Sequence, residues 1–216
     1  MKDIILFGMQ WSGKWTQCRN LLSQYGQQLI YFESGNILRA LKANDNAIGN
    51  YVKSLIDRGV YLPDNFLIGI LDLFIQILQP EQAMLMDWFP RRIGQMHMYL
   101  DRVYRLNRSL MGIYLNLDEQ VAITRLSMRR VCPQCVNIGI ANSESWQITC
   151  PNCDVPMVQR VDDTPDAIKL RIDQYKQETM PVLDHFRSLW LLYTVDADQS
   201  QEQVFGDIVN LIHSQL

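Results

Sequence analysis

The sequence lacks several features that would fix its class at once. Lys and Arg total 20 against 23 Asp and Glu, and this net charge of −3 leaves no basic field for nucleic acid or an anionic membrane. There are no repeats, and the longest apolar stretch, residues 66–78, is too short to span a bilayer. The apolar run that ends at Gly8 lacks the small-residue cleavage site of a secretory signal. We expect a cytoplasmic protein that binds neither nucleic acid nor membrane.

Cysteine is scarce, with five in 216 residues, which excludes a small disulfide scaffold. Cys18 stands alone in a helical pattern and is expected to be buried. The others form two Cys-x2-Cys pairs separated by residues 136–149: Cys132, Cys135, Cys150 and Cys153. Such spacing suits a tetrahedral zinc site, although a disulfide pair or unligated cysteines remain alternatives. A zinc ribbon that contacts nucleic acid is disfavoured because residues 137–147 contain no Lys or Arg.

The hydrophobic content of 48% is enough for one sizeable core. Short apolar runs predict five buried strands: Ile4–Phe7, Leu29–Phe32, Ala83–Met86, Gly112–Leu117 and Leu191–Val195. Helical periodicity lies between these runs, which predicts a parallel sheet with helices on both faces. Residues 42–63 and 131–159 depart from this alternation, and we interpret them as a helical insert and a small subdomain.

The first predicted strand leads into a glycine-bearing loop. The run Gly8-Met9-Gln10-Trp11-Ser12-Gly13-Lys14 matches the first part of the phosphate-loop pattern. In that pattern backbone N–H groups and a helix N-terminus surround a polyphosphate, and the lysine neutralises its outer charges. Trp15 stands where the pattern has Ser or Thr, and Thr16 follows it. The alternative is a simple strand-to-helix turn.

Taken in order, these and later motifs resemble the adenylate kinase family. The family loop reads Gly-x-Pro-Gly-x-Gly-Lys-Gly-Thr-Gln, and this chain matches it at Gly8, Gly13, Lys14, Thr16 and Gln17. Residues 34–39 look like the family motif Thr-Gly-Asp-x-Leu-Arg, and residues 87–91 look like Asp-Gly-Phe-Pro-Arg. The resemblance extends over residues 4–196, nearly the whole chain.

The resemblance implies a three-layer α/β P-loop fold with a parallel five-stranded sheet. The core would comprise residues 1–32, 63–129 and 164–216. A helical AMP-binding insert would comprise residues 33–62, and a zinc-ribbon-like lid would comprise residues 130–163. In one subgroup of the family the lid carries a structural Zn2+ held by four cysteines, which here would be the four in the Cys-x2-Cys pairs.

The resemblance also implies an activity, namely reversible transfer of a phosphoryl group from ATP to AMP with Mg2+, giving two ADP, by a monomer. The implied catalytic residues are Lys14, Asp87, Arg91, Arg125, Arg129, Arg160 and Arg171. The implied ATP-binding residues are Gly8, Ser12, Gly13, Lys14, Thr16, Arg125, Arg129 and Gln199. The implied AMP-binding residues are Ser34, Arg39, Leu62, Arg91, Gln95, Arg160 and Arg171.

Phosphoryl transfer explains this choice of residue types. The reaction needs aligned phosphates, neutralised charge and exclusion of water, and the planar guanidinium of Arg matches phosphate oxygens. Asp87 and the Thr16 hydroxyl are the hard oxygen groups that Mg2+ prefers. Any single Arg could equally form a surface ion pair, whereas seven basic residues at family positions are harder to explain in that way.

Two other functions stay open. The acceptor could be UMP or CMP, or the donor GTP, although Ser34 and Gln95 favour AMP. The chain could also be a nucleotide-binding protein without activity as written, because Trp11, Trp15 and Trp88 occupy family glycine positions. Trp146 and Trp190 also lie where a glycine would fit. Our hypothesis is that the gene comes from a lineage that reads UGA as glycine, and UGG codons would refute it.

Overall fold

The centre of the molecule is a parallel sheet of five strands, as the apolar runs predicted. The computed structural model describes residues 1–135, 137–141, 147–159 and 163–215. The strand order is β2-β3-β1-β4-β7. The strands are β1 (Asp3–Gly8), β2 (Leu29–Glu33), β3 (Ala83–Asp87), β4 (Leu110–Asn116) and β7 (Leu192–Asp196). Because all pairings are parallel, the carboxyl ends of the strands meet at one edge, where ligands bind in such folds.

All five strands differ from the predicted boundaries by one or two residues, and the starts of β4 and β7 have identifiable causes. β4 begins at Leu110 rather than Gly112, because Asp3 on β1 pairs with Leu110. β7 begins one residue later than predicted, because the Leu191 N–H donates to the Phe186 carbonyl and completes the preceding turn instead. Side chains such as Ile4, Ile5 and Leu85 are fully buried, which explains why the central strands are apolar throughout rather than alternating.

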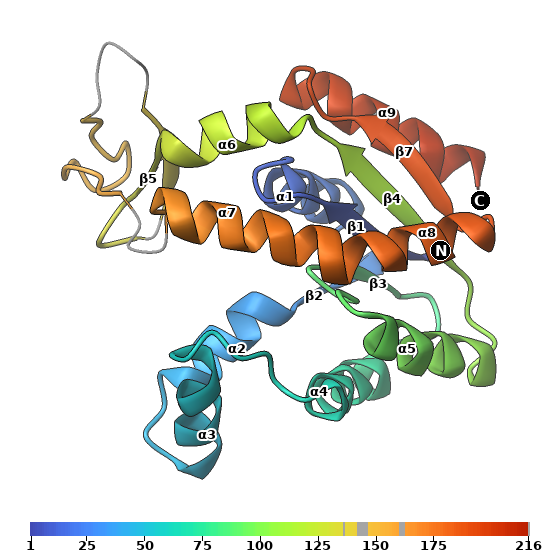
Figure 1. The fold of residues 1–216 in the computed structure, drawn as a ribbon. Coiled ribbons are helices and arrows are strands. Elements are labelled where there is room, and N and C mark those ends of the chain that lie inside the picture. The colour runs from blue at the N-terminus through green and yellow to red at the C-terminus, as the bar shows by residue number, and fades with distance from the viewer. Residues whose placement is uncertain (136, 142–146, 160–162, 216) are drawn as a thin grey trace.

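Helices cover both faces of the sheet (Figure 1). They are α1 (Lys14–Tyr25), α2 (Ser34–Lys42), α3 (Ala47–Ile56), α4 (Asp64–Ile77), α5 (Ile93–Arg105), α6 (Glu119–Ser127), α7 (Pro165–Gln174), α8 (Met180–Ser188) and α9 (Gln201–Ser214). A 3-10 turn, η1 (Gly26–Gln28), follows α1, and a π-helical turn, η2 (Tyr175–Thr179), joins α7 to α8. α1 packs with α9, and α5 packs with α4 and α8. Within the described residues, none of the helices has the length and hydrophobicity of a membrane span.

Two segments leave the sheet. The lobe formed by α2 and α3 lies to one side of it, between β2 and α4 (Figure 1). The Asn46 side chain caps α3 by accepting a hydrogen bond from the Gly49 N–H at 2.8 Å. The end of α2 approaches Gly49 closely, since a Cβ at this position would lie 2.7 Å from the Leu41 carbonyl oxygen. The second segment, which corresponds to the predicted lid, follows α6 and precedes α7, and a hairpin there pairs β5 (Arg129–Val131) with β6 (Ile138–Ile140). A bridge from Val131 to Val158 closes it.

A buried carboxylate ties the strands together at their amino ends. Asp3 is 1% exposed and accepts hydrogen bonds from the Met84 N–H (2.8 Å), the Tyr99 hydroxyl (3.1 Å) and the Arg108 guanidinium (3.0 Å). The hydrogen bonds of Asp3 thus join β1 to β3, to α5 and to the segment that leads into β4. A buried charge that loses its partner is costly, so this cluster stabilises the fold only while it is complete.

We expect Asp3→Ala to lower the free energy of unfolding by about 3–5 kcal/mol, because it leaves Arg108 and two buried donors unpaired. Urea denaturation measures the change. Asp101→Ala is the matched control, since Asp101 forms an exposed pair with Arg105 one helical turn away, and its loss should cost about 0.5 kcal/mol. Equal effects of the two substitutions would contradict the assignment of Asp3 as a structural anchor.

Candidate active site

The glycine loop (residues 8–13) joins β1 to α1 at the carboxyl edge of the sheet. Gly8 has a φ of 152°, and a Cβ there would lie 2.9 Å from the Leu115 carbonyl oxygen. Gly13 has a φ of 90° and is the N-cap of α1, which has no side-chain cap. The first-turn N–H groups of α1 are therefore left to an anionic ligand, an arrangement that suits phosphate.

Lys14 is the first residue of α1, and its side chain folds back into the glycine loop, where it is 6% exposed. Its Nζ donates to the carbonyls of Gly8 (2.7 Å) and Met9 (2.8 Å). Burial lowers the pKa of Lys14 and the positive Arg91 lowers it further, while Asp87 opposes the shift. Burial raises the pKa of Asp87, at the end of β3, to about 6, against the opposing charge of Lys14. Bringing a phosphate or a cation to this pair would compensate for its desolvation.

Unpartnered polar atoms surround the loop. In the described part of the chain, buried oxygens of Gln10, Ser12, Gln17 and Asp87 have no hydrogen-bond partner. Buried polar atoms are normally satisfied, so four orphans around one loop indicate a ligand-binding site. Asp87 in particular offers a free carboxylate oxygen of the kind that Mg2+ prefers, and Thr16 lies half-buried in the first turn of α1.

The predicted AMP residues gather around the turn that follows β3. The Trp88 carbonyl accepts from Ser34 Oγ (3.2 Å) and from Arg91 Nε (2.9 Å). The Gln95 amide oxygen accepts from the Arg91 N–H (2.9 Å), and its amide nitrogen donates to Asp64 (3.0 Å). These bonds fix three side chains at one place, at the entrance to the α2–α3 lobe.

Arg39 and Leu62 complete the predicted AMP set. Leu62 is buried just before α4. Arg39 is more than half exposed and contacts Glu33 (3.3 Å) and Asn36. Asn36 also donates to Glu33, so this residue, where the family motif has Asp, links the carboxylate to the arginine.

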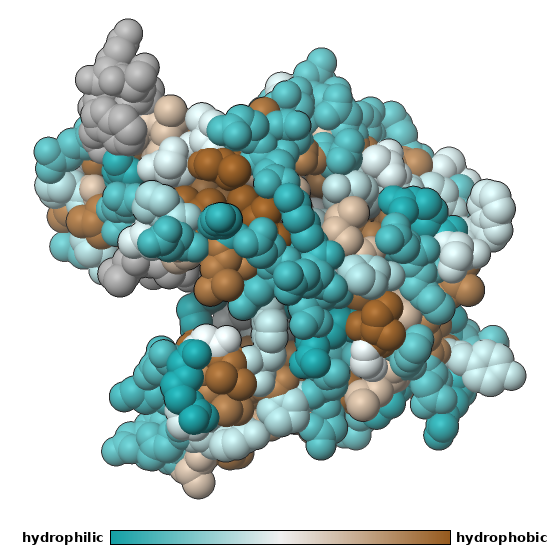
Figure 2. Space-filling view, viewed as in Figure 1, coloured by the Kyte–Doolittle hydropathy of each residue, from teal (hydrophilic) through white to brown (hydrophobic). Residues whose placement is uncertain are grey.

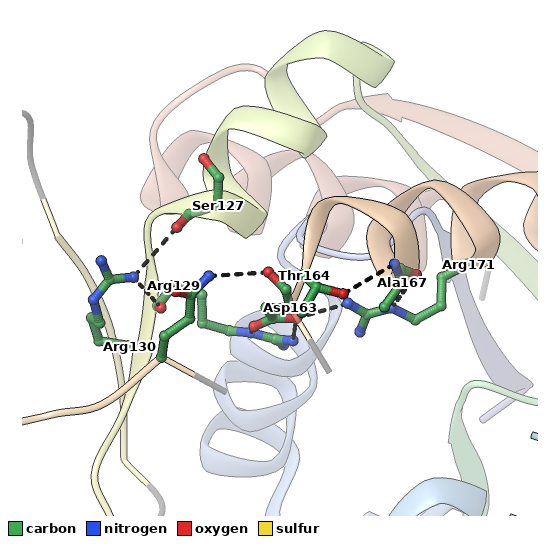
Figure 3. Close-up of polar contacts among 8 residues, drawn as sticks. Ser127, Arg129, Arg130, Asp163, Thr164, Ala167 and Arg171 are labelled. Atoms are coloured by element: carbon green, nitrogen blue, oxygen red, sulfur yellow. Dashed lines mark hydrogen bonds and ion pairs between the residues drawn. The ribbon is translucent and has the colours of Figure 1, made fainter. Parts of the chain in front are cut away.

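Two predicted arginines meet across the base of the lid (Figure 3). Arg129 from β5 and Arg171 from α7 both donate to the carboxylate of Asp163, Arg171 at 2.7 Å. Burial alone would raise the pKa of Asp163, but the hydrogen bonds from the two guanidiniums outweigh it and hold the pKa below its usual range. The Arg129 guanidinium also lies 5.7 Å from the Trp11 ring, next to the glycine loop. Arg160 lies outside the described residues.

Arg125 lies apart from the Asp163 cluster. Its guanidinium donates to Asp198 at 3.2 Å, in the turn between β7 and α9. Gln199 in the same turn donates to the Asp196 carbonyl (2.9 Å) and to Asp207 (3.0 Å). This turn lies at the carboxyl end of β7, so both residues border the same edge of the sheet as the glycine loop.

Three acidic residues hold the predicted site together, and none of them had a predicted role, although Asp163 lies at the spacing of the adenylate kinase family. Glu33 accepts from the Tyr31 hydroxyl (3.1 Å) and from Arg39 (3.3 Å), Asp64 binds Gln95 and Arg92, and Asp163 joins the two lid-side arginines. A signal existed for Glu33, because it directly follows a predicted strand. Pairing of Asp163 with residues on β5 and α7 depends on tertiary structure and leaves no local pattern.

Asp163→Asn should make stability less dependent on pH in acid. The folded pKa of Asp163 lies below its ordinary value of 3.8, so the unfolded chain takes up the proton first as the pH falls. Its stabilisation is therefore fully present above pH 3.8 and is lost as the pH falls through the folded pKa. Urea denaturation from about pH 5 down to about pH 2 should show a shallower dependence of stability on pH for Asp163→Asn than for Asp101→Asn. Identical slopes would contradict the pairing.

The four paired cysteines form one cluster. Their sulfurs all lie within 4.8 Å of one another, and Cys135 Sγ lies 3.5 Å from Cys150 Sγ. The N–H groups of Cys135 and Gln134 donate to Cys132 Sγ and favour its thiolate, so the pKa of Cys132 falls to about 6, with the Cys135 N–H the larger cause. All five cysteines are free thiols, and Cys18 is buried as predicted. The cluster is compatible with a tetrahedral zinc site.

Known proteins share this sequence pattern along almost the whole chain. A family model described as adenylate kinase matches residues 6–190. The chain is 32% identical to an adenylate kinase of Chlamydia trachomatis serovar L2, over 99% of this chain and 91% of that protein. It is 31% identical to one of Chlamydia pneumoniae (97% and 96%) and 30% identical to one of Lactobacillus johnsonii (98% and 99%). With the five-stranded sheet, the glycine loop and the four-cysteine cluster, these matches show that the chain belongs to the adenylate kinase family, phosphotransferases of the nucleoside monophosphate kinase type.

Proposed function

We propose that the chain transfers the terminal phosphoryl group of ATP to AMP, reversibly, giving two ADP. The observation that carries this proposal is the gathering of basic side chains around the glycine loop and the turn after β3, at the carboxyl edge of the sheet. Arg171 and Arg129 share Asp163, and Arg129 lies beside the Trp11 ring of the glycine loop. Lys14 and Arg91 both lie against the Trp88 ring, and Arg39 interacts electrostatically with Arg91. Positive charge distributed in this way suits two polyphosphates placed end to end.

ATP would occupy the glycine loop. The uncapped N-terminus of α1 would receive its β-phosphate, and Lys14 would turn from the loop carbonyls to the β- and γ-phosphate oxygens. Arg129 and Arg171 would neutralise the transferred group from the lid side. Arg125 and the turn at residues 196–200 would border the adenine, with Arg160 as a further lid contact.

AMP would occupy the entrance to the α2–α3 lobe. Arg91 and Arg39 would bind its phosphate, while Gln95 and Ser34 would present polar groups to the adenine beside the apolar side chain of Leu62. Gln95 suits this role because Asp64 and the Arg91 N–H already fix the orientation of its amide. An amide whose orientation is already fixed loses little conformational entropy when it hydrogen-bonds to the edge of a base.

Catalysis would come from position and charge. The γ-phosphoryl group moves from the β-phosphate oxygen of ATP to a phosphate oxygen of AMP, and the chain supplies neutralising donors rather than a covalent partner. The surface is hollowed between the lid and the α2–α3 lobe (Figure 2). We assign residues 130–163 as the lid and residues 33–62 as the AMP insert, and their closure over the core would exclude water.

Two metals fit the residues present. Mg2+, held through Asp87 and Thr16, would neutralise phosphate charge, and the orphaned Asp87 oxygen supports this assignment. Zn2+ would be held by the four clustered thiolates. The apolar core of the lid is small, with Cys132, Cys150 and Met157 its buried members, so the lid needs a bound metal to keep its shape.

A substrate panel tests the assignment. With glycine in place of Trp11, Trp15 and Trp88, kcat/KM should be highest for AMP among AMP, UMP and CMP, and higher with ATP than with GTP. Loss of a buried hydrogen-bonding match typically costs a factor of about 10² or more in kcat/KM. Preference for UMP or CMP would contradict the role of Gln95. Nucleotide binding without turnover would favour a non-catalytic protein.

A further inference from the structure

Three tryptophans have a backbone conformation that bulky side chains avoid. Trp11, Trp88 and Trp190 have φ values of 66°, 65° and 59°, in the left-handed region. That region suits glycine, and a bulky residue there is an outlier. Among the described residues, the other non-glycine positions with positive φ are Asn107 and Asp154, the residue types that tolerate it best. Three of the four described tryptophans are therefore at positions built for glycine.

Trp190 provides evidence that is independent of the active site. At the end of α8 the Trp190 N–H donates to the Arg187 carbonyl (3.1 Å) and the Leu191 N–H to the Phe186 carbonyl (3.0 Å). This is a Schellman turn, whose left-handed position is usually glycine. The side chain of Trp190 is 89% exposed, so no packing compensates for the strain.

The same turn occurs twice more in the described residues and has the expected residue each time. After α3, Gly59 has a φ of 68°, its N–H donates to the Ile56 carbonyl, and the next N–H donates to Leu55. After α5, Asn107 has a φ of 49° and the same pair of bonds. Glycine and asparagine are the usual choices at this position, and tryptophan at the third turn departs from both.

In the active site the indoles occupy the places where phosphates would bind. The Trp88 ring lies 4.8 Å from Lys14 Nζ and 4.1 Å from the Arg91 guanidinium, and the Trp11 ring lies 5.7 Å from Arg129. These three cations are among those that the proposed function assigns to the phosphates. The Trp11 indole nitrogen is buried and has no partner in the described structure, so this ring does not complete a polar network.

We propose that glycine, not tryptophan, occupies positions 11, 88 and 190 of the protein that the host makes, because the gene carries UGA there and the host reads UGA as glycine. The same codon would account for Trp15, in the first turn of α1 directly after Lys14, and for Trp146, outside the described residues. At positions 11 and 88 the absence of a side chain serves the function, because it lets phosphate reach these cations. The catalytic part of this inference rests on the proposed function, and the part that concerns Trp190 does not.

Trp190 gives a test of conformation alone. Trp190→Gly in the full chain should raise Tm by about 2–4 °C, from relief of left-handed strain. Trp190→Ala is the matched control: it removes the indole but keeps a Cβ, so it should raise Tm less. Neither should change kcat in a chain that already has glycine in place of Trp11, Trp15 and Trp88. An equal or lower Tm for Trp190→Gly would count against the inference.

The active-site positions give the second test. The triple variant Trp11→Gly, Trp15→Gly and Trp88→Gly should bind ATP more tightly and form ADP at least about 10²-fold faster than the chain with all five tryptophans. The corresponding triple alanine variant should recover less, because positions 11 and 88 need a positive φ.

Sequencing the gene and the protein isolated from the host tests the glycine inference separately from the proposed adenylate kinase activity. UGA codons, with glycine in the peptide masses at positions 11, 88 and 190, are the expected result. UGG codons, or tryptophan in those peptides, would overturn the inference even if the chain proves to be an active adenylate kinase. Glycine in the peptides together with an inactive triple variant would leave the inference standing and overturn the proposed function.

Discussion

Replacing Lys14 with methionine, in the chain with glycine in place of Trp11, Trp15 and Trp88, is expected to lower kcat for ADP formation by about 10³-fold. The buried Lys14 ammonium is the cation that lies inside the glycine loop, and its carbonyl partners there are easily exchanged for phosphate oxygens. Methionine keeps much of the volume and removes the charge. A coupled assay of ADP formation from ATP and AMP measures the loss.

The control for this prediction is Lys42→Met. Lys42 is a partly exposed lysine at the end of α2 that pairs with Asp57, away from the glycine loop. Its replacement should leave kcat within about twofold, as for other surface charge pairs. Because Lys14 is buried, circular dichroism and Tm of both variants must show a folded chain. A Lys14→Met variant that is folded and retains more than a tenth of the activity would contradict its role.

Loss of the lid metal is expected to have the second large effect. Replacing Cys150 with serine should abolish stoichiometric zinc binding and unfold the lid, while the core stays folded. Two of the four ligands, Cys132 and Cys150, are also buried members of the small apolar cluster there, and Met157 is its third. Metal binding supplies about 10 kcal/mol or more in small domains of this kind. Hydrogen exchange should then show the amides of β5 and β6 unprotected and those of β1 and β4 still protected.

The same variant should lower kcat by about 10²-fold or more, since Arg129 begins strand β5, which pairs with β6 of the lid, and its guanidinium binds Asp163. Cys18→Ala is the control, because Cys18 is a buried core residue outside the cluster, and this variant should keep one zinc per chain. A Cys150→Ser variant that purifies without metal but still shows protected lid amides would contradict the proposed dependence of the lid on zinc.

Patterns that depend on short stretches of sequence could be predicted. The five buried strands follow from apolar runs, and the glycine loop follows from its residue order, because each reflects local backbone geometry or burial on both faces. The cysteine cluster follows from spacing, since two Cys-x2-Cys turns leave few other arrangements. The unusual backbone at Trp11 and Trp88 was also foreseeable, from glycines at those positions in the family motifs.

What depended on tertiary contacts could not be predicted. Asp163 joins strand β5 to helix α7, and no pattern in the sequence pairs it with Arg129 and Arg171. Arg125 shows the same limit, because its pairing with Asp198 follows from how β7 ends next to α6. The left-handed turn at Trp190 needed the hydrogen bonds at the end of α8 before its meaning was clear.

The central claim is that one group of basic side chains binds ATP and AMP end to end, so that the γ-phosphoryl group passes directly from one to the other. Its most direct measurement is the stoichiometry of the reaction catalysed by the chain with glycine in place of Trp11, Trp15 and Trp88. We predict that two ADP form for each ATP consumed, that one AMP disappears with them, and that ATP is stable when AMP is left out. Release of inorganic phosphate from ATP at the same rate with and without AMP would contradict the claim.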